Sequence, residues 1–366
     1  MTHPTDNQSQ ASQVKVMTWN LYFGASTDLL RTAETPDIPG IVADILQMVK
    51  ATDFPARAQI VAKEIARTAP DLIGLQEVAL WRVCSPGRFM QSARRHLMSK
   101  NKLLRCFGLL AWLLHGTQRN ANEVLYDFLE ILLSELTRLG LNYAPVAVRT
   151  GADIEAPAAT GVDLRYTDRN VILARTDLPP GQFRVLNGRA GDFSQSFSKG
   201  VLAGVGVNIA RGWVAVDVQV GTRLFHFFNT HLDPDCPKVQ LSQARNLLRI
   251  TADGELPLVV VGDFNHDANL AGSYFFKELA AGGLVDIWPQ AGVGNGHTAL
   301  HDDNLLNAES CLDARIDLIM TRGDVKAVSA ELTGAHPAYR TPEGLSTAGR
   351  LWPSDHAGVV AALEII

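Results

Sequence analysis

Hydrophobic runs of strand type recur along the chain from Val14 onward. Several are almost continuously apolar, such as Leu258–Val261, and this pattern suits a strand that is covered on both faces. The segment Asp217–Arg223 lies between two such runs and is typical of a β-hairpin. We expect β-strands at 14–19, 71–76, 142–149, 170–175, 213–220, 223–230, 257–262, 315–320 and 357–364.

Segments of helical periodicity separate these strands. Pro55 opens one helix at a position where its missing N–H is tolerated, and its apolar stripe contains Ala58, Val61, Ala62, Ile65, Ala66 and Ala69. A second helix is expected over about 123–139, ending at Gly140. A third begins near Pro237 and carries Leu241, Ala244, Leu248 and Ile250. Strands and helices alternate, yet short turns join some neighbouring strands. The pattern therefore predicts an α/β sandwich with mixed sheets rather than a fully parallel, doubly wound sheet.

Composition adds that the chain is globular. It has 366 residues, of which 46% are hydrophobic, which is enough for one large domain or two small ones and excludes disorder throughout. The net charge of −5 provides no global nucleic-acid footprint, although a local one stays open. The cysteines show no CxxC spacing, so we expect reduced thiols rather than a zinc site or disulfides; they are Cys84, Cys106, Cys236 and Cys311.

The first residues, 1–13, are polar and are expected to form a flexible tail. They contain no apolar core of a secretory signal, and no apolar run in the chain reaches the length of a membrane span. We therefore expect a cytoplasmic protein, with export by another route left open.

Polar and ionisable side chains stand at the ends of several apolar strands, where open α/β sheets present ligands. They are Asn20, Glu77, His231, Asp263 with Asn265, and Asp355 with His356. Asp317 lies inside an apolar strand, and a buried carboxylate needs a partner. Each residue alone has an ordinary explanation, such as a turn cap, an exposed strand end or a hydrogen-bonded core histidine. Together they are more informative than any single member.

These residue types suit a particular chemistry. Carboxylate and amide oxygens without cysteine favour a hard cation, Mg²⁺ or Mn²⁺. His231 and His356 each lie close in sequence to an acid, which suits proton transfer and stabilisation of a charged phosphoryl group. No P-loop and no Gly-x-Ser-x-Gly elbow is present in the sequence. The residues therefore predict metal-assisted hydrolysis of a phosphate ester.

In their order from Asn20 to His356, these motifs resemble those of the endonuclease/exonuclease/phosphatase superfamily. That group contains deoxyribonuclease I, exonuclease III, neutral sphingomyelinases and inositol polyphosphate 5-phosphatases. The resemblance implies a four-layered α/β sandwich with two mixed β-sheets, formed by one domain over 14–366. It also implies that Asn20 and Glu77 hold a catalytic Mg²⁺, for which Mn²⁺ can substitute. Asp355 would sit near the metal or complete a second site.

The same resemblance assigns roles to the other motif residues. His231 would contact the scissile phosphate, and Asn265 would hold a phosphate oxygen. Asp263 would orient or activate the water, or protonate the leaving oxygen. His356 would act as general base or phosphate clamp, with Asp317 fixing its tautomer.

Three features bear on the substrate. Asn170 and Lys199 fall where such proteins contact substrate, although a plain loop explains either equally well. Segment 78–122 contains no acidic residue and eight basic ones, and it carries an amphipathic helix that ends at Gly116. This segment could pack on the sandwich, lie in a membrane interface or neutralise nucleic-acid phosphates.

The leading hypothesis is an Mg²⁺-dependent phosphodiesterase that acts on nucleic acid or, like a sphingomyelinase, on a phospholipid headgroup. An inositol-phosphate-type phosphomonoesterase is less favoured, because no dense Lys/Arg cluster adjoins the Asp263 or His356 motifs. A non-catalytic binding module that retains the fold is the alternative from another class. No obligate protein partner is evident from the sequence.

Overall fold

The fold is known from a computed structural model of the chain, which describes residues 12–26, 37–84, 120–195, 201–202, 205–206, 210–252, 254–270 and 272–366. Lys199 and the amphipathic helix expected before Gly116 lie outside these residues. In the described ranges no helix has the length and apolar character needed to cross a membrane. Strand β1 starts at Ser12, so two residues expected in the tail pair instead with Ile365 and Glu364.

The first sheet has the strand order β15-β16-β1-β2-β6-β3-β4, and β5 pairs with the free edge of β6. Strands β1 and β2 are parallel and the other pairs are antiparallel, so the sheet is mixed. Its strands are β1 (Ser12–Asn20), β2 (Leu72–Gln76), β3 (Leu80–Cys84), β4 (Glu123–Asp127), β5 (Tyr143–Pro157), β6 (Asp163–Arg175), β15 (Val325–Thr333) and β16 (Gly358–Ile365).

The second sheet has the order β13-β14-β12-β11-β10-β7, and only its β11–β12 pair is parallel within the described residues. Its strands are β7 (Phe183–Asp192), β10 (Gly212–Val220), β11 (Arg223–His231), β12 (Leu258–Asp263), β13 (Val285–Asp286) and β14 (Asp317–Arg322). Strands β8 (Val201–Leu202) and β9 (Val205–Gly206) form a separate pair. The predicted hairpin is confirmed, with Val220 opposite Arg223.

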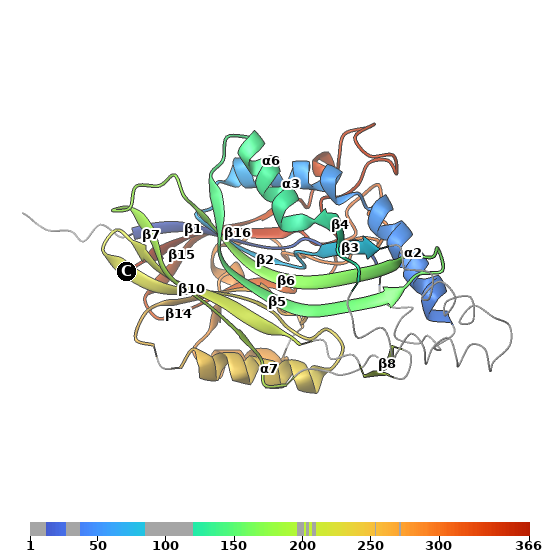
Figure 1. The fold of residues 1–366 in the computed structure, drawn as a ribbon. Helices are drawn as coiled ribbons and strands as arrows, with labels where there is room; N and C mark the ends of the chain where they lie inside the picture. Colours follow the sequence, from blue (N-terminus) through green and yellow to red (C-terminus); the bar gives the residue numbers. More distant parts are fainter. Residues whose placement is uncertain are drawn as a thin grey trace, which may run out of the picture.

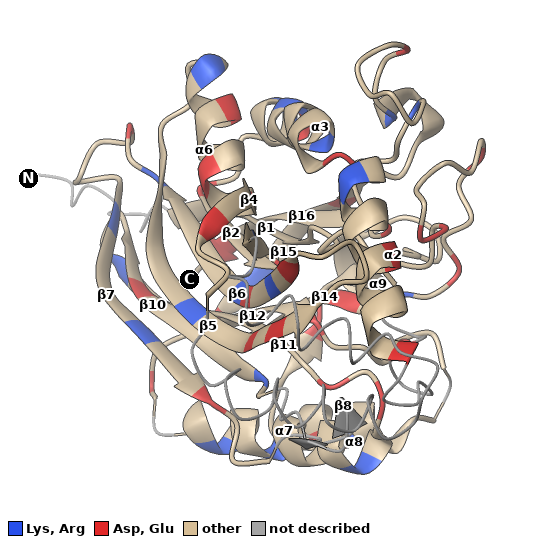
Figure 2. Cartoon of the chain, turned by 45° about the vertical axis from the view of Figure 1, so that its right-hand side comes forward, with Lys and Arg blue, Asp and Glu red and all other residues tan. Residues whose placement is uncertain are grey.

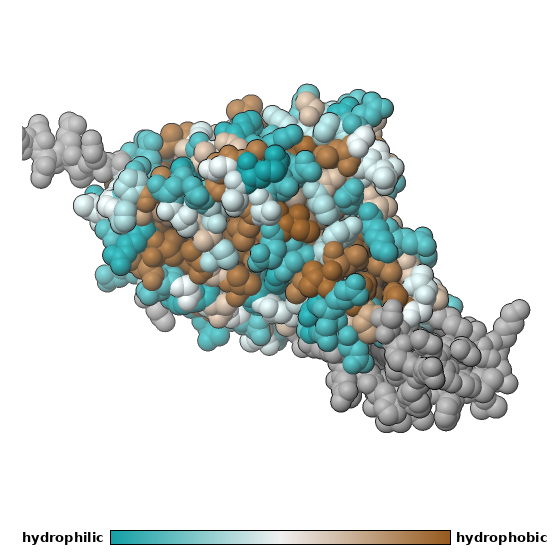
Figure 3. Space-filling model, turned by 45° about the horizontal axis from the view of Figure 1, so that its top comes forward, coloured by the Kyte–Doolittle hydropathy of each residue, from teal (hydrophilic) through white to brown (hydrophobic). Residues whose placement is uncertain are grey.

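Helices cover the outer face of each sheet (Figure 1). On the first sheet lie α2 (Ile38–Ala51), α3 (Phe54–Thr68) and α6 (Phe128–Arg138), and on the second lie α7 (Pro237–Ile250) and α8 (Tyr274–Ala281). The short helices α9 (Trp288–Ala291) and η2 (Pro337–Tyr339) belong to connections. On the face that carries α2, α3 and α6, apolar residues are interspersed with polar ones (Figure 3). Helix, sheet, sheet and helix follow one another, so the predicted four-layered α/β sandwich is confirmed.

The alternation of side chains along β1 explains how the layers are held together. Val14 and Val16 pack between the two sheets, whereas Met17 and Trp19 pack on the other face against the helices. Successive side chains of a strand point to opposite faces, so Asn20 points in the direction of Val14 and Val16. The row between the sheets thus changes from apolar to polar at the end of the strand.

The second sheet shows the same change at the same end. Phe227 of β11 and Val261 of β12 pack between the sheets, and on the same faces His231 lies four residues after Phe227 and Asp263 two residues after Val261. The register places His231 directly opposite Asp263. The polar ends of the two inner faces therefore meet at one rim of the sandwich.

Behind this rim a buried polar bridge joins the two sheets. The Gln76 Nε2 of the first sheet donates to Asn229 Oδ1 of the second at 2.6 Å. In return the Asn229 Nδ2 donates to the carbonyls of Leu75 and Val171 at 2.9 and 3.0 Å. Gly74 leaves space for this bridge, because a Cβ there would lie 2.9 Å from the Asn229 Cγ. The bridge fixes the offset of one sheet against the other.

One predicted helix begins later than expected. Residues 123–127, assigned to the helix of 123–139, form strand β4, which pairs with β3. The Asp127 Oδ1 accepts hydrogen bonds from the backbone N–H groups of Leu129 and Glu130, and so caps α6 at that point. Strand β3 in turn begins at Leu80, inside the segment 78–122, so the described start of that segment belongs to the first sheet.

Strands β7 and β15 have no counterpart among the predicted strands. Most of their residues are partly or fully exposed, so neither has an apolar run for a pattern to detect. Charges of both signs lie on β7 and β10 (Figure 2), and some of them pair, as in the contact of 2.6 Å between Arg189 Nη2 and Asp217 Oδ1. This face of the second sheet is therefore solvated and held by ion pairs.

Candidate active site

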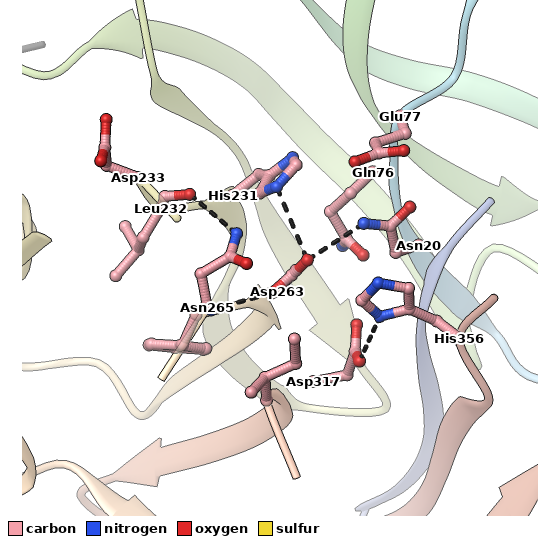
Figure 4. Close-up of polar contacts among 12 residues, drawn as sticks. Asn20, Gln76, Glu77, His231, Leu232, Asp233, Asp263, Asn265, Asp317 and His356 are labelled. Carbon is pink, nitrogen blue, oxygen red and sulfur yellow. Dashed lines mark hydrogen bonds and ion pairs between the residues drawn. The ribbon is translucent and has the colours of Figure 1, made fainter. Parts of the chain in front are cut away.

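Asp263 lies at the centre of the polar rim (Figure 4). Its Oδ2 accepts a hydrogen bond from the Asn20 Nδ2 at 3.0 Å and lies 3.5 Å from the His231 Nε2. All three side chains are almost completely buried. Since Asn20 comes from the first sheet and His231 from the second, Asp263 links the two halves of the site.

His356 and Asp317 form a buried pair beside Asp263 (Figure 4). The His356 Nδ1 lies 2.7 Å from the Asp317 Oδ2. The second oxygen, Asp317 Oδ1, is buried and has no hydrogen-bond partner among the described residues. The Ser354 hydroxyl accepts from the His356 N–H and donates to the Asn20 carbonyl at 2.7 Å, which ties this segment to the end of β1.

Glu77 follows β2 and carries its carboxylate to the same rim (Figure 4). Its Oε2 accepts from the Phe23 N–H at 2.9 Å. Burial and the negative charge of Asp355 raise the pKa of Glu77 to about 8. Three non-glycine residues near the strand ends, Glu77, Asn265 and Tyr22, have positive φ angles of 54°, 49° and 53°. This conformation is uncommon for such residues and is often kept where a side chain must be presented in one direction.

Asn265 and Asn170 flank the rim in different ways. The Asn265 side chain donates to the Leu232 carbonyl at 3.0 Å, and its N–H donates to the Asp263 Oδ1 at 2.8 Å. Asn170 is buried, and neither atom of its amide has a partner within the described residues. The Val78 N–H donates to the carbonyl of Arg169. Asn170, which follows Arg169, therefore lies on β6 beside the end of β2, where Glu77 precedes Val78.

Four acidic side chains gather around this rim: Glu77, Asp263, Asp317 and Asp355. The ligand atoms of Asp263, Asp317 and His356 lie within 4.8 Å of one another, and all three residues are buried. Burial and the charge of Asp317 raise the pKa of Asp263 to about 6, and burial also raises the pKa of Asp355. A divalent cation would relieve this crowding of like charges. The oxygen-rich donor set and the unpartnered Asp317 Oδ1 fit a hard cation.

This compact group differs from the metal set that the family resemblance implies, which is Asn20, Glu77 and Asp355. The Asn20 Oδ1 accepts from the Tyr22 N–H at 2.9 Å, and the Asp355 Oδ1 lies 3.2 Å from the Ser354 Oγ. Asp355 Oδ1 also lies 3.8 Å from the His356 Nε2. Both groups therefore lie at the same rim, and Asp355 of the implied metal set is next to His356 of the compact group.

The pKa values of the two histidines are shifted in opposite directions. Burial lowers the pKa of His231 well below its usual value, and the positive charges of Arg211, His356 and Arg149 lower it further. Burial also disfavours the charged form of His356, but the carboxylates of Asp317 and Asp355 outweigh it and raise its pKa well above the usual value. The pKa values of the two imidazoles are thus shifted in opposite directions, a division typical of acid–base sites.

Two contacts depart from what the sequence indicated for His231. Asp233, the acid next to it in sequence, points away (Figure 4), and its Oδ1 accepts from the N–H groups of Asp235 and Cys236 before α7. The ring instead has Arg211 as its neighbour, with Nη1 2.9 Å from the His231 Nδ1. Arg211 immediately precedes Gly212, which pairs with His231 across β10 and β11. The predicted hairpin already placed residue 212 opposite residue 231, so it could have indicated that Arg211 lies near His231.

Sequence reasoning also missed His301. Its N–H donates to the Asp355 carbonyl at 3.1 Å, and its ring stacks on Trp352 with centroids 4.0 Å apart. The His301 Nδ1 faces the Asn307 amide at 3.0 Å, while its Nε2 is buried without a partner among the described residues. No strand-end pattern marks this loop residue.

Known proteins resemble this chain in fold. A protein of the endonuclease/exonuclease/phosphatase family from Bacteroides thetaiotaomicron aligns with a TM-score of 0.56 and 17% identity over 98% of this chain and 99% of its own. One from Leptotrichia buccalis aligns with a TM-score of 0.54 and 15% identity over 96% and 99%. A mannosyl-6-phosphatase from Bacteroides thetaiotaomicron aligns with a TM-score of 0.53 and 18% identity over 96% and 99%.

At the level of sequence, a comparison with curated proteins found no match. The profile of the Endonuclease/Exonuclease/phosphatase family matches residues 17–356, which include Asn170 and every predicted residue of the rim. The family indicated by the motifs is thereby confirmed, and the chain belongs to the endonuclease/exonuclease/phosphatase family.

Proposed function

We propose that this protein hydrolyses phosphodiester bonds with water as the nucleophile and with a divalent cation, Mg²⁺ or Mn²⁺, as cofactor. One observation carries the proposal. Asp263 contacts Asn20 of the first sheet and His231 of the second, directly beside the His356–Asp317 pair. This arrangement supplies carboxylate, amide and imidazole groups around a single point, as phosphoryl transfer requires.

Asn20, Glu77 and Asp355 would hold the cation, with the Asp263–Asp317–His356 group adjoining it. When bound, the cation supplies charge stabilisation at a phosphoryl oxygen. The support for these residues is their oxygen chemistry and the crowding of their negative charges at the rim.

His356 is proposed to clamp the phosphate. Asp317 accepts from the Nδ1 side of its ring at 2.7 Å, which leaves Nε2 for the substrate. The positive charge that the neighbouring carboxylates favour on His356 suits a clamp better than a general base. His231 would donate a hydrogen bond to another phosphate oxygen.

Asp263 is proposed to orient the attacking water and accept its proton. Asn20 and Asn265 hold the two oxygens of its carboxylate in place, the first at Oδ2 and the second at Oδ1. A pKa near 6 lies close enough to neutral pH for a general base.

Substrate contacts are proposed for Asn170 and Lys199. In Asn170 a buried amide with no partner among the described residues is costly unless a ligand satisfies it. For Lys199 the support is its sequence motif alone. A non-catalytic binding module is less favoured. Such a module would be expected to have lost one or more of the motif residues, whereas this chain retains all of those predicted at the rim.

Hydrolysis of bis-p-nitrophenyl phosphate tests the proposal. The wild-type protein should turn over this diester with Mg²⁺ or Mn²⁺ and stop when EDTA is added. Glu77→Gln and His356→Gln should each lower kcat at least ~100-fold. His226→Gln is the matched control, because His226 lies on the same strand as His231 but contacts Asp217, away from the rim.

Wild-type turnover equal to that of both site variants would reject catalysis and favour the binding module. Plasmid DNA, RNA and sphingomyelin liposomes, compared side by side, would identify the class of diester. Faster turnover of p-nitrophenyl phosphate and mannose 6-phosphate than of any diester would overturn the phosphodiesterase assignment in favour of a phosphomonoesterase.

A further inference from the structure

The contact between Arg211 and His231 indicates which ring nitrogen of His231 carries the proton. The Arg211 Nη1 is 2.9 Å from the His231 Nδ1. A guanidinium group remains protonated in proteins and can only donate hydrogen bonds. The Nδ1 of His231 must therefore be the acceptor and cannot carry a proton.

The proton of the neutral ring is then on Nε2. This atom faces the polar rim, 3.5 Å from the Asp263 Oδ2. Because His231 is 2% exposed and its strongest cationic neighbour already occupies Nδ1, a second proton on the ring is disfavoured. His231 is thus arranged to donate one hydrogen bond into the site.

The neighbours of Arg211 show that its position is built into the fold. Its Nη1 lies 4.0 Å from the Asp168 Oδ2, and Asp168 is itself held by the Tyr166 hydroxyl at 3.2 Å. The preceding carbonyl, that of Ala210, accepts from the Arg149 Nη2 at 3.0 Å. The side chain of Arg211 is 13% exposed, and its Nε is buried without a partner in the described part of the chain.

The other histidine of the site has the opposite arrangement. The Asp317 carboxylate accepts at the Nδ1 of His356, so that nitrogen must carry a proton. The Nδ1 of His356 therefore donates a hydrogen bond to Asp317, whereas the Nδ1 of His231 accepts one from Arg211. The partner at Nδ1 determines what Nε2 can offer to a substrate.

We propose that Arg211 is a positioning residue that holds His231 as the Nε2–H tautomer, so that His231 donates to an oxygen of the substrate phosphate. This role rests on the proposed phosphodiesterase function. A carboxylate in place of Arg211 would move the proton to Nδ1 and leave Nε2 an acceptor facing Asp263 and the anionic phosphate, which repels both.

The tautomer can be observed directly by ¹⁵N NMR of protein labelled at the histidine rings, with His231 assigned from His231→Gln. At about pH 7 the wild-type protein should show a protonated Nε2 and an unprotonated Nδ1 at His231. Arg211→Met should shift His231 to the Nδ1–H tautomer or to a mixture, and should lower kcat on bis-p-nitrophenyl phosphate ~10–100-fold with little change in KM. Arg211→Lys should retain part of the Nε2–H tautomer of His231 and part of the wild-type kcat.

Arg189→Met is the matched control, because Arg189 is an arginine of the same sheet that pairs with Asp217 and should affect neither tautomer nor rate. A proton on Nδ1 of His231 in the wild-type protein would overturn the proposal even if no variant folds. An unchanged tautomer in Arg211→Met would overturn it as well. A wild-type protein that hydrolyses no diester would defeat the proposed function instead, while the NMR result would still decide the tautomer.

Discussion

Arg57 is a completely buried cation whose hydrogen bonds all go to backbone carbonyls in the described structure. Its guanidinium donates to Thr52 and Leu21 at 2.7 and 2.8 Å, and to Pro353 and Tyr22 at 2.8 and 3.1 Å. Leu21 and Tyr22 directly follow Asn20 of the site, and Pro353 precedes its Ser354-Asp355-His356 segment. One side chain thus braces both loops that carry the first-sheet half of the rim.

Replacing Arg57 with methionine should cost about 5 kcal/mol of unfolding free energy. The change leaves four carbonyls without their donor, at roughly 2 kcal/mol each. Against this, burial lowers the pKa of Arg57 to about 10. This shift corresponds to about 3 kcal/mol that disfavours the charged form and is released when the guanidinium is removed. The difference agrees with the usual cost of breaking a buried charged network, roughly 3–5 kcal/mol.

Urea unfolding followed by circular dichroism measures this loss, and the hydrolysis of bis-p-nitrophenyl phosphate by the folded fraction reports on the loops. Arg245→Met is the control. Among the described residues, the exposed Arg245 pairs with residues of α8 at the surface, so its replacement should leave the urea midpoint unchanged. A loss below about 1 kcal/mol for Arg57→Met would refute the reasoning, since the carbonyls would then have found other donors.

Three further outcomes are expected. Gly74→Ala places a Cβ 2.5 Å from the Val261 Cγ2, so the variant should lose about 1–3 kcal/mol of stability and hydrolyse the diester more slowly. Gly40→Ala is the control, because a Cβ there meets open space and should change neither property. Equal urea midpoints for the two variants would contradict this expectation. Burial and the charge of His356 lower the pKa of His301 to about 4, so its share of the stability is complete above about pH 6.5 and falls toward pH 4. His301→Phe should therefore flatten that part of the acid decline, and parallel curves of urea midpoint against pH would exclude it. Mg²⁺ should raise the melting temperature of the wild-type protein, corresponding to about 1–3 kcal/mol at saturating concentration, and the rise should shrink in Glu77→Gln; an equal rise in both would count against Glu77 as a ligand.

The candidate site was accessible from the sequence because the strands that build it are buried on both faces. Asn20, His231 and Asp263 each end an apolar run, so the change from apolar to polar marks the rim in the sequence itself. Period-two alternation then places each side chain between the sheets without knowledge of the fold. The family resemblance supplied the layer order, which no single strand pattern contains.

Other features depend on contacts between different segments of the chain. Arg211 reaches His231 only because β10 and β11 pair in one register. The residues before Asp127 have helical periodicity, yet pairing with β3 makes them a strand and Asp127 caps the helix behind them. His301 is a loop residue whose position depends on stacking against Trp352. In each case tertiary packing, rather than local propensity, decides the structure.

The pairing of β1 with β16 determines when the candidate site can be assembled. Ser12 lies opposite Ile365. Both edges of β1, the first described strand, are therefore paired only once β16, the last described strand, has been made. His356 lies two residues before the start of that strand. A growing chain on the ribosome would thus contain Asn20, Glu77 and Asp263 long before it contains Asp355 and His356. The candidate site would therefore be assembled only after nearly all of the described fold has been synthesised.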